Sequence, residues 1–179
     1  MSPPSPDSSV EGQQLLVILR HGKAEAFAAE DHRRRLTDRG RRAAVAAGQW
    51  LAERGIVPTH AFVSSAVRAQ DTWAAAVEGA GWVVDARIED AVYTADADSA
   101  LDLLRTAPAD ARTVVIVGHN PTAASLAHFL DDGNPEPDAF RAMTRGFPPG
   151  ALAVLEVAVP WAELGAATGH LVAFHVGKG

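Results

Sequence analysis

An arginine and a histidine stand side by side where a predicted strand of this sequence enters a glycine turn. Arg20 and His21 directly follow the apolar run 15–19 (LLVIL) and precede Gly22. A short apolar run that ends in a turn is typical of a buried strand in an α/β sheet. Such sheets bind ligands in the crevice at the carboxyl ends of their strands. A permanent cation beside a potential nucleophile at that edge suits the handling of a phosphoryl group.

Two more predicted strands lead to residues of the same kind. His119 follows the unbroken run 113–117 (TVVIV), and Arg68 lies one turn into the helix that follows the short run 61–63. Parallel strands end at the same edge of a sheet, so these residues can converge although they are far apart in the sequence. Guanidinium groups bind phosphate oxygens in pairs, whereas they repel cations and are not metal ligands. Each residue alone would more often be structural, but together they predict a phosphate site without a metal.

The elements that must position these residues alternate between strands and helices, which predicts an α/β protein. We expect a three-layer α/β/α sandwich with a mostly parallel central sheet. The expected strands are 15–19, 61–63, 82–84, 113–117, 151–157 and 171–176. The expected helices run from a Thr37 cap to Gly55, over 66–80, from an Asp96 or Asp98 cap to about Pro108, and from Pro121 at the first helical position. The polar stretches 23–35 and 131–149 are expected to be loops.

Composition restricts the class of protein. The 179 residues suit one domain, and the net charge of −6 disfavours nucleic acid and anionic membrane surfaces as partners. The sequence has no cysteine, which excludes disulfides, zinc–thiolate sites and cysteine-based phosphatases and fits a cytoplasmic protein. We expect residues 1–13, which are rich in serine and proline, to form a disordered tail, and residues 14–179 to form a single domain.

Four short motifs in this order resemble the histidine phosphatase (phosphoglycerate mutase-like) superfamily. They are residues 19–22 (LRHG), 34–40 (RRLTDRG), 64–72 (SSAVRAQDT) and 118–121 (GHNP). Within that superfamily the small size and the segments 150–156 (GALAVLE) and 161–164 (WAEL) resemble the SixA-type phosphohistidine phosphatases. The resemblance covers the chain from about residue 15 to about residue 174. It implies a phosphoglycerate mutase-like fold.

The resemblance also implies roles for individual residues. His21 would be the nucleophile and would carry the phosphoryl group as a phosphohistidine intermediate. Arg20, Arg68 and His119 would complete the phosphate pocket, and Arg34 matches a further arginine near the phosphate. Physical chemistry agrees, because adjacent arginines disfavour the imidazolium form of a histidine and stabilise the equatorial oxygens during in-line transfer. No cofactor or metal is expected.

The general acid is the least defined part of the predicted site. Larger members of the superfamily use a glutamate after the third strand, and Glu89 and Asp90 lie in that neighbourhood. An exposed loop carboxylate is an equally good interpretation of both. A phosphohistidine substrate releases an imidazole, which needs less help from an acid than an alkoxide does. An undefined acid therefore favours a phosphohistidine substrate.

The sequence thus predicts a cytoplasmic phosphatase that acts on phosphohistidine in a protein. A phosphatase of small phosphate esters with the same pocket is the first alternative. A non-catalytic module that binds a phosphorylated ligand is an alternative of another class. Retention of both His21 and His119 argues against that module, because binding alone would need only the arginines. The expected partner is a phosphorylated protein or a small phosphorylated molecule, with neither nucleic acid nor a membrane.

Overall fold

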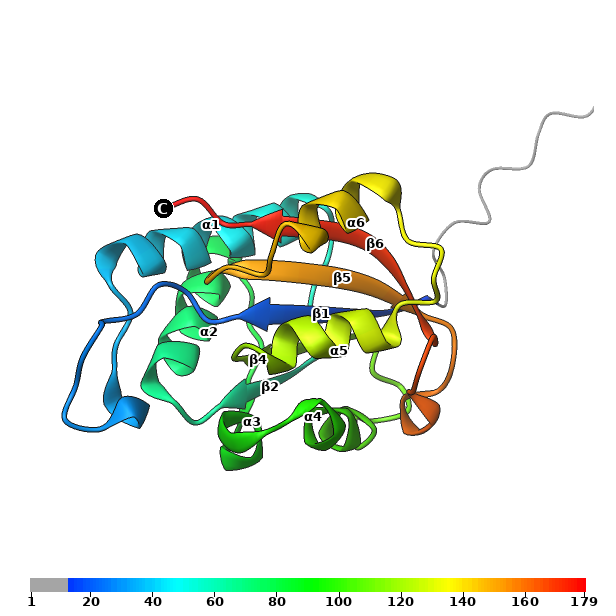
Figure 1. The fold of residues 1–179 in the computed structure, drawn as a ribbon, viewed down its shortest axis with the longest axis horizontal. Helices are drawn as coiled ribbons and strands as arrows, with labels where there is room; N and C mark the ends of the chain where they lie inside the picture. Colours follow the sequence, from blue (N-terminus) through cyan, green and yellow to red (C-terminus); the bar gives the residue numbers. More distant parts are fainter. Residues whose placement is uncertain (1–12) are drawn as a thin grey trace, which may run out of the picture.

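A computed structural model describes residues 13–179 and shows six strands in one sheet, in the order β3-β2-β4-β1-β5-β6 (Figure 1). The strands are β1 (Gln14–Arg20), β2 (His60–Ser64), β3 (Ala86–Glu89), β4 (Thr113–Gly118), β5 (Ala151–Val157) and β6 (Gly169–Val176). The α-helices are α1 (Asp38–Glu53), α2 (Val67–Ala80), α3 (Asp90–Thr94), α4 (Ala97–Leu104), α5 (Thr122–Leu130) and α6 (Pro137–Thr144). Two short 3-10 turns, η1 (Asp31–Arg33) and η2 (Trp161–Glu163), complete the elements.

The sheet joins a parallel part to an antiparallel part. Strands β3, β2, β4 and β1 pair in parallel, whereas β5 pairs antiparallel with both β1 and β6. The parallel strands are connected through helices, as crossover connections require. The carboxyl ends of β1, β2 and β4 therefore meet at one edge, beside the blue segment between β1 and α1 in Figure 1. The predicted three-layer fold with a mostly parallel sheet is confirmed.

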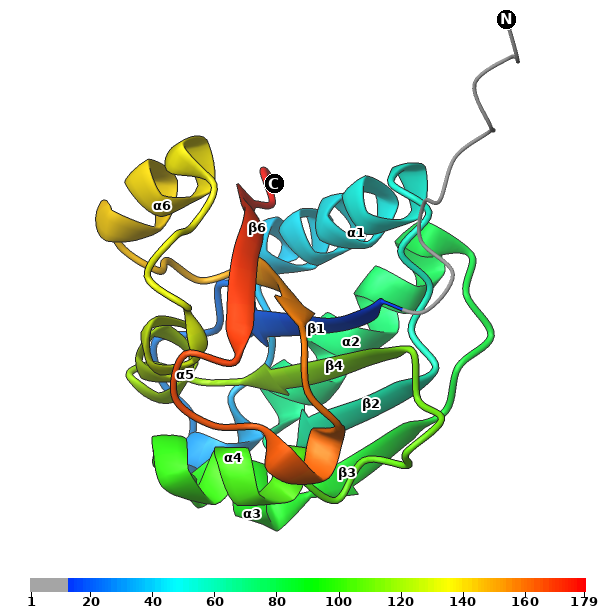
Figure 2. The same cartoon turned by 90° about the vertical axis from the view of Figure 1, so that its right-hand side faces the viewer.

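Side chains alternate between two apolar cores, one on each face of the sheet. In β1, Val17 and Leu19 pack with the α1 and α2 side, while Leu16 and Ile18 pack with the α4, α5 and α6 side. Figure 2 shows these helices on opposite sides of the strands. Burial on both faces explains why β1 and β4 are almost wholly apolar.

Helix α2, which carries Arg68 in its first turn, packs very closely against α1. An added Cβ at Gly48 of α1 would lie 2.0 Å from the Ala76 carbonyl oxygen, and one at Gly79 of α2 would lie 2.2 Å from that of Val45. The predicted caps Thr37 and Asp96 are present, because Thr37 accepts a hydrogen bond from the Gly40 amide and Asp96 accepts one from the Ser99 amide. This close contact fixes α2, and with it Arg68, relative to α1.

Three sequence predictions about elements were wrong. Residues 82–84 form no strand: Val83 is fully exposed while Trp82 is buried, and the edge strand begins only at Ala86. The segment 131–149 contains helix α6, whose few apolar residues, such as Met143, hid its helical period. Helix α5 begins at Thr122, so Pro121 is its cap rather than its first residue. The predicted tail 1–13, except for Gln13, lies outside the described residues.

None of the helices in residues 13–179 is long and apolar enough to cross a membrane.

Candidate active site

The structure brings the predicted histidines and arginines together at the carboxyl edge of the parallel strands. Arg20 is the last residue of β1 and pairs with Gly118, so His21 and His119 leave neighbouring strands at the same level. Their ring centroids lie 5.1 Å apart. The His21 amide donates to the Gly118 carbonyl at 3.0 Å, which continues the sheet pairing by one step. The sheet itself therefore determines how the two imidazoles face each other.

His21 presents one defined ring nitrogen for chemistry. Its Nδ1 lies 2.8 Å from its neighbour's carbonyl, Gly22 O, so Nδ1 carries the proton and donates it. The Nε2 atom then keeps its lone pair. Burial, together with the charges of Arg68 and Arg20, lowers the pKa of His21 to about 4, although the bond to Gly22 acts in the opposite direction. The ring is consequently neutral at pH 7, as an attacking imidazole must be.

The turn that holds His21 is fixed by close backbone packing. The Gly22 amide donates to Thr72 Oγ1 at 3.0 Å, and Thr72 in turn donates to the Arg68 carbonyl at 2.6 Å. A Cβ on Gly22 would lie 2.8 Å from the Gly40 carbonyl oxygen, and a Cβ on Gly40 would lie 2.1 Å from that of Lys23. Both motif glycines are therefore needed because two backbone segments touch.

Arg20 and Arg68 are each held by their outer guanidinium nitrogens and keep their Nε atoms free. Arg20 Nη1 donates to the Phe147 carbonyl at 2.9 Å. Arg68 donates from Nη1 to the Asp31 carbonyl at 2.9 Å and from Nη2 to the Asp31 carboxylate at 3.1 Å. Both Nε atoms are buried and have no hydrogen-bond partner in the described part of the chain. Buried donors without partners are costly, which is typical of a site that receives an anion.

His119 has the opposite arrangement of its ring nitrogens. Its Nε2 lies 2.7 Å from the hydroxyl of Ser64, whereas its Nδ1 is buried and unpaired among residues 13–179. Burial lowers the pKa of His119 to about 3, helped by its neighbours His21 and Arg68. Within residues 13–179, the unpaired nitrogens are thus Nε of Arg20, Nε of Arg68 and Nδ1 of His119, among others. Together they can bind a ligand with several acceptor oxygens. A phosphoryl group is such a ligand.

The segment between β1 and α1 is anchored over this site by Asp31. Its carboxylate accepts hydrogen bonds from Arg34 Nε and the Tyr93 hydroxyl, both at 2.9 Å, in addition to the bond from Arg68. Partial desolvation opposes the shift, but the bonds from Tyr93 and Arg34 lower the pKa of Asp31 to about 2. Next to it, His32 Nε2 lies 3.0 Å from Ser65 Oγ. Asp31 therefore orients Arg68 and ties it to Arg34.

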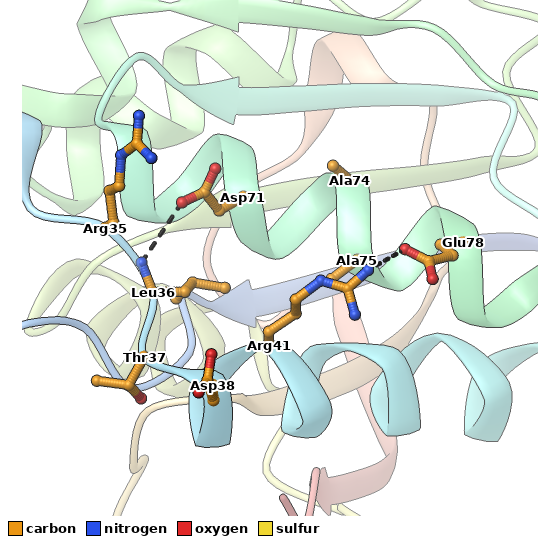
Figure 3. A pocket seen from close by; sticks show the side chains of 9 residues that line it. All are labelled: Arg35, Leu36, Thr37, Asp38, Arg41, Asp71, Ala74, Ala75 and Glu78. Atoms are coloured by element: carbon orange, nitrogen blue, oxygen red, sulfur yellow. Dashed lines mark hydrogen bonds and ion pairs between the residues drawn. The ribbon is translucent and has the colours of Figure 1, made fainter.

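Arg34 lies in this segment, and its charge helps to lower the pKa of His21. Its Nη1 donates to the Glu25 carbonyl at 2.9 Å, so its guanidinium is held mainly by the segment itself. The end of the segment is fixed by the Leu36 amide, which lies 3.4 Å from the Asp71 carboxylate. Figure 3 shows this contact in a groove of about 300 Å³ between α1 and α2, which also contains the ion pair of Arg41 with Glu78. The residues that line this groove do not include Arg20, His21, Arg68 or His119.

The two candidates for a general acid lie at the end of β3 and the start of α3, and Glu89 pairs with Ser64 in the sheet. Glu89 is the last residue of β3, and its carboxylate forms an ion pair with Arg87. Asp90 is exposed in the first turn of α3. In residues 13–179, neither carboxylate is hydrogen-bonded to His21 or His119. The acid role of Glu89 remains a prediction.

Sequence reasoning gave no role to four residues that shape the site. Ser64 and Thr72 belong to a motif that was recognised, but nothing local indicates what their hydroxyls touch. Asp31 and Tyr93 are 62 positions apart, and only the folded chain joins them. For Asp31 the sequence offered one signal: it is an acidic residue in a predicted loop that must cover arginines.

The chain matches a family model and several relatives. The model of the histidine phosphatase superfamily (branch 1) matches residues 16–96. The uncharacterised protein ML1117 of Mycobacterium leprae is 34% identical over 146 residues, which are 82% of this chain and 88% of that protein. The uncharacterised protein Rv1276c of Mycobacterium tuberculosis is 31% identical over 160 residues, 88% of this chain and 99% of that protein.

Solved structures show the same fold. A candidate phosphohistidine phosphatase SixA from Nakamurella multipartitia has a TM-score of 0.80 and 36% identity, covering 92% of this chain and 96% of its own. The corresponding protein of Agrobacterium tumefaciens has a TM-score of 0.75 and 27% identity, covering 91% and 97%. With its phosphoglycerate mutase-like fold and its two histidines at neighbouring strand ends, this chain belongs to the histidine phosphatase superfamily and is of the SixA type.

Proposed function

We propose that this protein is a metal-independent phosphatase that removes the phosphoryl group from phosphohistidine in proteins through a covalent intermediate on His21. One observation carries the proposal: the Nδ1–H of His21 is bound by Gly22 O, so a neutral imidazole presents its Nε2 lone pair beside two arginines. The similar structures from Nakamurella and Agrobacterium are named as candidate phosphohistidine phosphatases, which supports the same substrate class.

The reaction proceeds in two displacements at phosphorus. First, Nε2 of His21 forms a bond to phosphorus while the bond to the substrate nitrogen breaks, and the leaving imidazole takes up a proton from solvent. Second, a water oxygen attacks phosphorus, the bond to Nε2 breaks, and inorganic phosphate leaves. In both steps Arg20, Arg68 and His119 stabilise the three equatorial oxygens, and Arg34 adds positive charge nearby.

The surroundings of the histidines favour a nitrogen leaving group over an alkoxide. In the part of the chain that the structure describes, no carboxylate is hydrogen-bonded to His21 or His119, and Glu89 is paired with Arg87. An imidazole leaves as a weakly basic group, so the first step can proceed without a dedicated acid. Small phosphate esters are the second candidate substrates, because the same nitrogens would bind any phosphoryl group.

Trapping of the intermediate tests the mechanism and the substrate together. Wild type, His21→Ala and the control His128→Ala, which changes an exposed histidine of α5, are assayed on a phosphohistidine-bearing protein and on a panel of small phosphate esters. We expect an acid-labile phosphoenzyme in wild type and His128→Ala and none in His21→Ala. Normal turnover by His21→Ala would remove the proposed nucleophile. Hydrolysis of esters alone would leave the mechanism standing and replace the substrate. Binding of phosphate without any turnover would support the non-catalytic module.

A further inference from the structure

We propose that Ser64 is a positioning residue that holds His119 in the tautomer with its proton on Nδ1, so that this nitrogen donates a hydrogen bond to the phosphoryl group. The inference rests on the proposed function for its consequence in catalysis. The tautomer itself can be measured without any assay of activity.

Ser64 lies where it can act on His119 and on little else. It is the last residue of β2, and its side chain is fully buried. Its Oγ lies 2.7 Å from Nε2 of His119 and 3.2 Å from the amide nitrogen of Ala66. The Ala66 amide can only donate, so it uses one lone pair of Ser64. The hydroxyl keeps one proton and one lone pair for the histidine.

The hydrogen-bond count decides between the two neutral tautomers. If Nε2 of His119 carried the proton, Ser64 would accept two hydrogen bonds and its own buried O–H would have no acceptor among the described residues. An unpaired buried donor costs about 1–3 kcal/mol. If Ser64 instead donates to the lone pair of Nε2, every one of these groups is paired. The proton of His119 then lies on Nδ1.

That nitrogen is the one that meets the substrate. Nδ1 of His119 is buried and has no partner in residues 13–179, and the His119 ring lies 5.1 Å from the ring of His21. A lone pair on Nδ1 would repel phosphate oxygens, whereas an N–H attracts them. The tautomer set by Ser64 therefore converts a neutral imidazole into a donor for the transferred group.

The charged groups around His119 favour the neutral ring. Burial, His21, Arg68 and Arg20 all lower its pKa, and Asp31 alone among the principal influences raises it. A neutral ring has only one N–H, so its position matters. In an imidazolium both nitrogens would donate and Ser64 would have no tautomer to select.

Nitrogen NMR of the free protein tests the tautomer directly. The two nitrogens of His119, assigned by their loss in His119→Ala, distinguish an N–H from a lone pair by their chemical shifts and couplings. We expect protonated Nδ1 in wild type and in Ser64→Thr, which keeps the hydroxyl on a β-strand. Ser64→Ala is expected to give a mixture of tautomers. Protonated Nε2 in wild type would overturn the proposal, whether or not any variant folds.

Kinetics then tests the consequence. Ser64→Ala is expected to slow formation of the phosphoenzyme about 10-fold to 100-fold, the worth of one hydrogen bond to a charged group. Ser64→Thr should recover most of that loss. Ser65→Ala is the matched control, because it removes the neighbouring hydroxyl, which contacts His32 and not His119.

The outcomes separate this inference from the proposed function. Equal rates and unchanged His119 resonances in Ser64→Ala and Ser65→Ala would overturn the role of Ser64, while a phosphoenzyme on His21 would still stand. A fully active His21→Ala variant would instead show that turnover needs no phosphoenzyme on His21, and it would overturn the proposed function. The tautomer measured by NMR would then remain as a structural fact without its catalytic consequence.

Discussion

The two histidines at neighbouring strand ends use opposite ring nitrogens and are held by different means. His21 donates from Nδ1 to the carbonyl of the next residue and leaves Nε2 open. His119 uses Nε2 toward Ser64, a side chain 55 positions away, and leaves Nδ1 open. One ring offers a lone pair and the other can offer a proton. The roles proposed for them, nucleophile and donor, thus follow from their hydrogen-bond partners, since both are neutral imidazoles.

Removing each imidazole in turn gives the largest expected effects and separates the two roles. We expect His21→Ala to lose on the order of 10⁴-fold or more in phosphohistidine turnover, because the covalent route disappears. His119→Ala should lose on the order of 10²-fold to 10³-fold, the usual worth of one donor to a developing charge. Rapid-quench measurement of the phosphoenzyme distinguishes them: absent in the first variant, slow in the second. Equal losses with no phosphoenzyme in either would make the two rings equivalent.

Acidification should charge both rings only far below the usual histidine range. The pKa values of His21 and His119 are lowered to about 4 and about 3, so NMR titration should show both neutral at pH 5. Below about pH 4 the nucleophile should be lost about tenfold per pH unit. In the unfolded chain both histidines titrate near 6.5. Between that pH and pH 4 the unfolded chain therefore binds more protons than the folded chain. The free energy of unfolding should therefore decrease as the pH falls through that interval. Titration of either ring near 6.5 would contradict this.

Thr72→Val sharpens the comparison, because it touches the backbone on which His21 depends. The variant keeps the shape of the side chain but leaves the Gly22 amide without its acceptor. We expect a loss of about 1–3 kcal/mol in the free energy of unfolding, measured by urea denaturation, together with slower phosphoenzyme formation. Thr106→Val is the control, since Thr106 is exposed at the end of α4 and bonds only locally. Equal stability of the two variants would remove Thr72 from the support of His21.

The smallest effect is expected for Glu89→Gln. The Glu89 carboxylate forms an ion pair with Arg87 and, among the described residues, has no hydrogen bond to His21 or His119. Phosphohistidine turnover should therefore stay close to wild type. Assays with phosphohistidine and with a small phosphate ester check this in parallel. A large loss with both substrates would identify Glu89 as the general acid, a third titratable group beside His21 and His119. A loss with the ester alone would mean that Glu89 acts as an acid only for poorer leaving groups, such as alkoxides.

Much of the site could be read from the sequence, because its residues stand at the ends of strands with clear apolar patterns. The motif at 19–22 and the run 113–117 placed His21 and His119 at one edge, and the structure puts them there. The support of these residues could not be read. The contacts of Ser64 and Asp31 depend on how loops and strands meet in space, which no local period encodes. The edge strand β3 was misplaced because Trp82 and Val83 look like a strand although only the tryptophan is buried.

The close contact of Gly22 with Gly40 sets a limit on how this protein can be redesigned. In a library that randomises every glycine, positions 22 and 40 should return glycine alone, since any side chain there would push backbone against backbone. Gly81, at the end of α2, has a φ of +70° and no neighbour within 4 Å of an added Cβ, so asparagine should survive there. New specificity would therefore have to be built from the exposed residues of the segment 23–35, while the turn that presents His21 is kept unchanged.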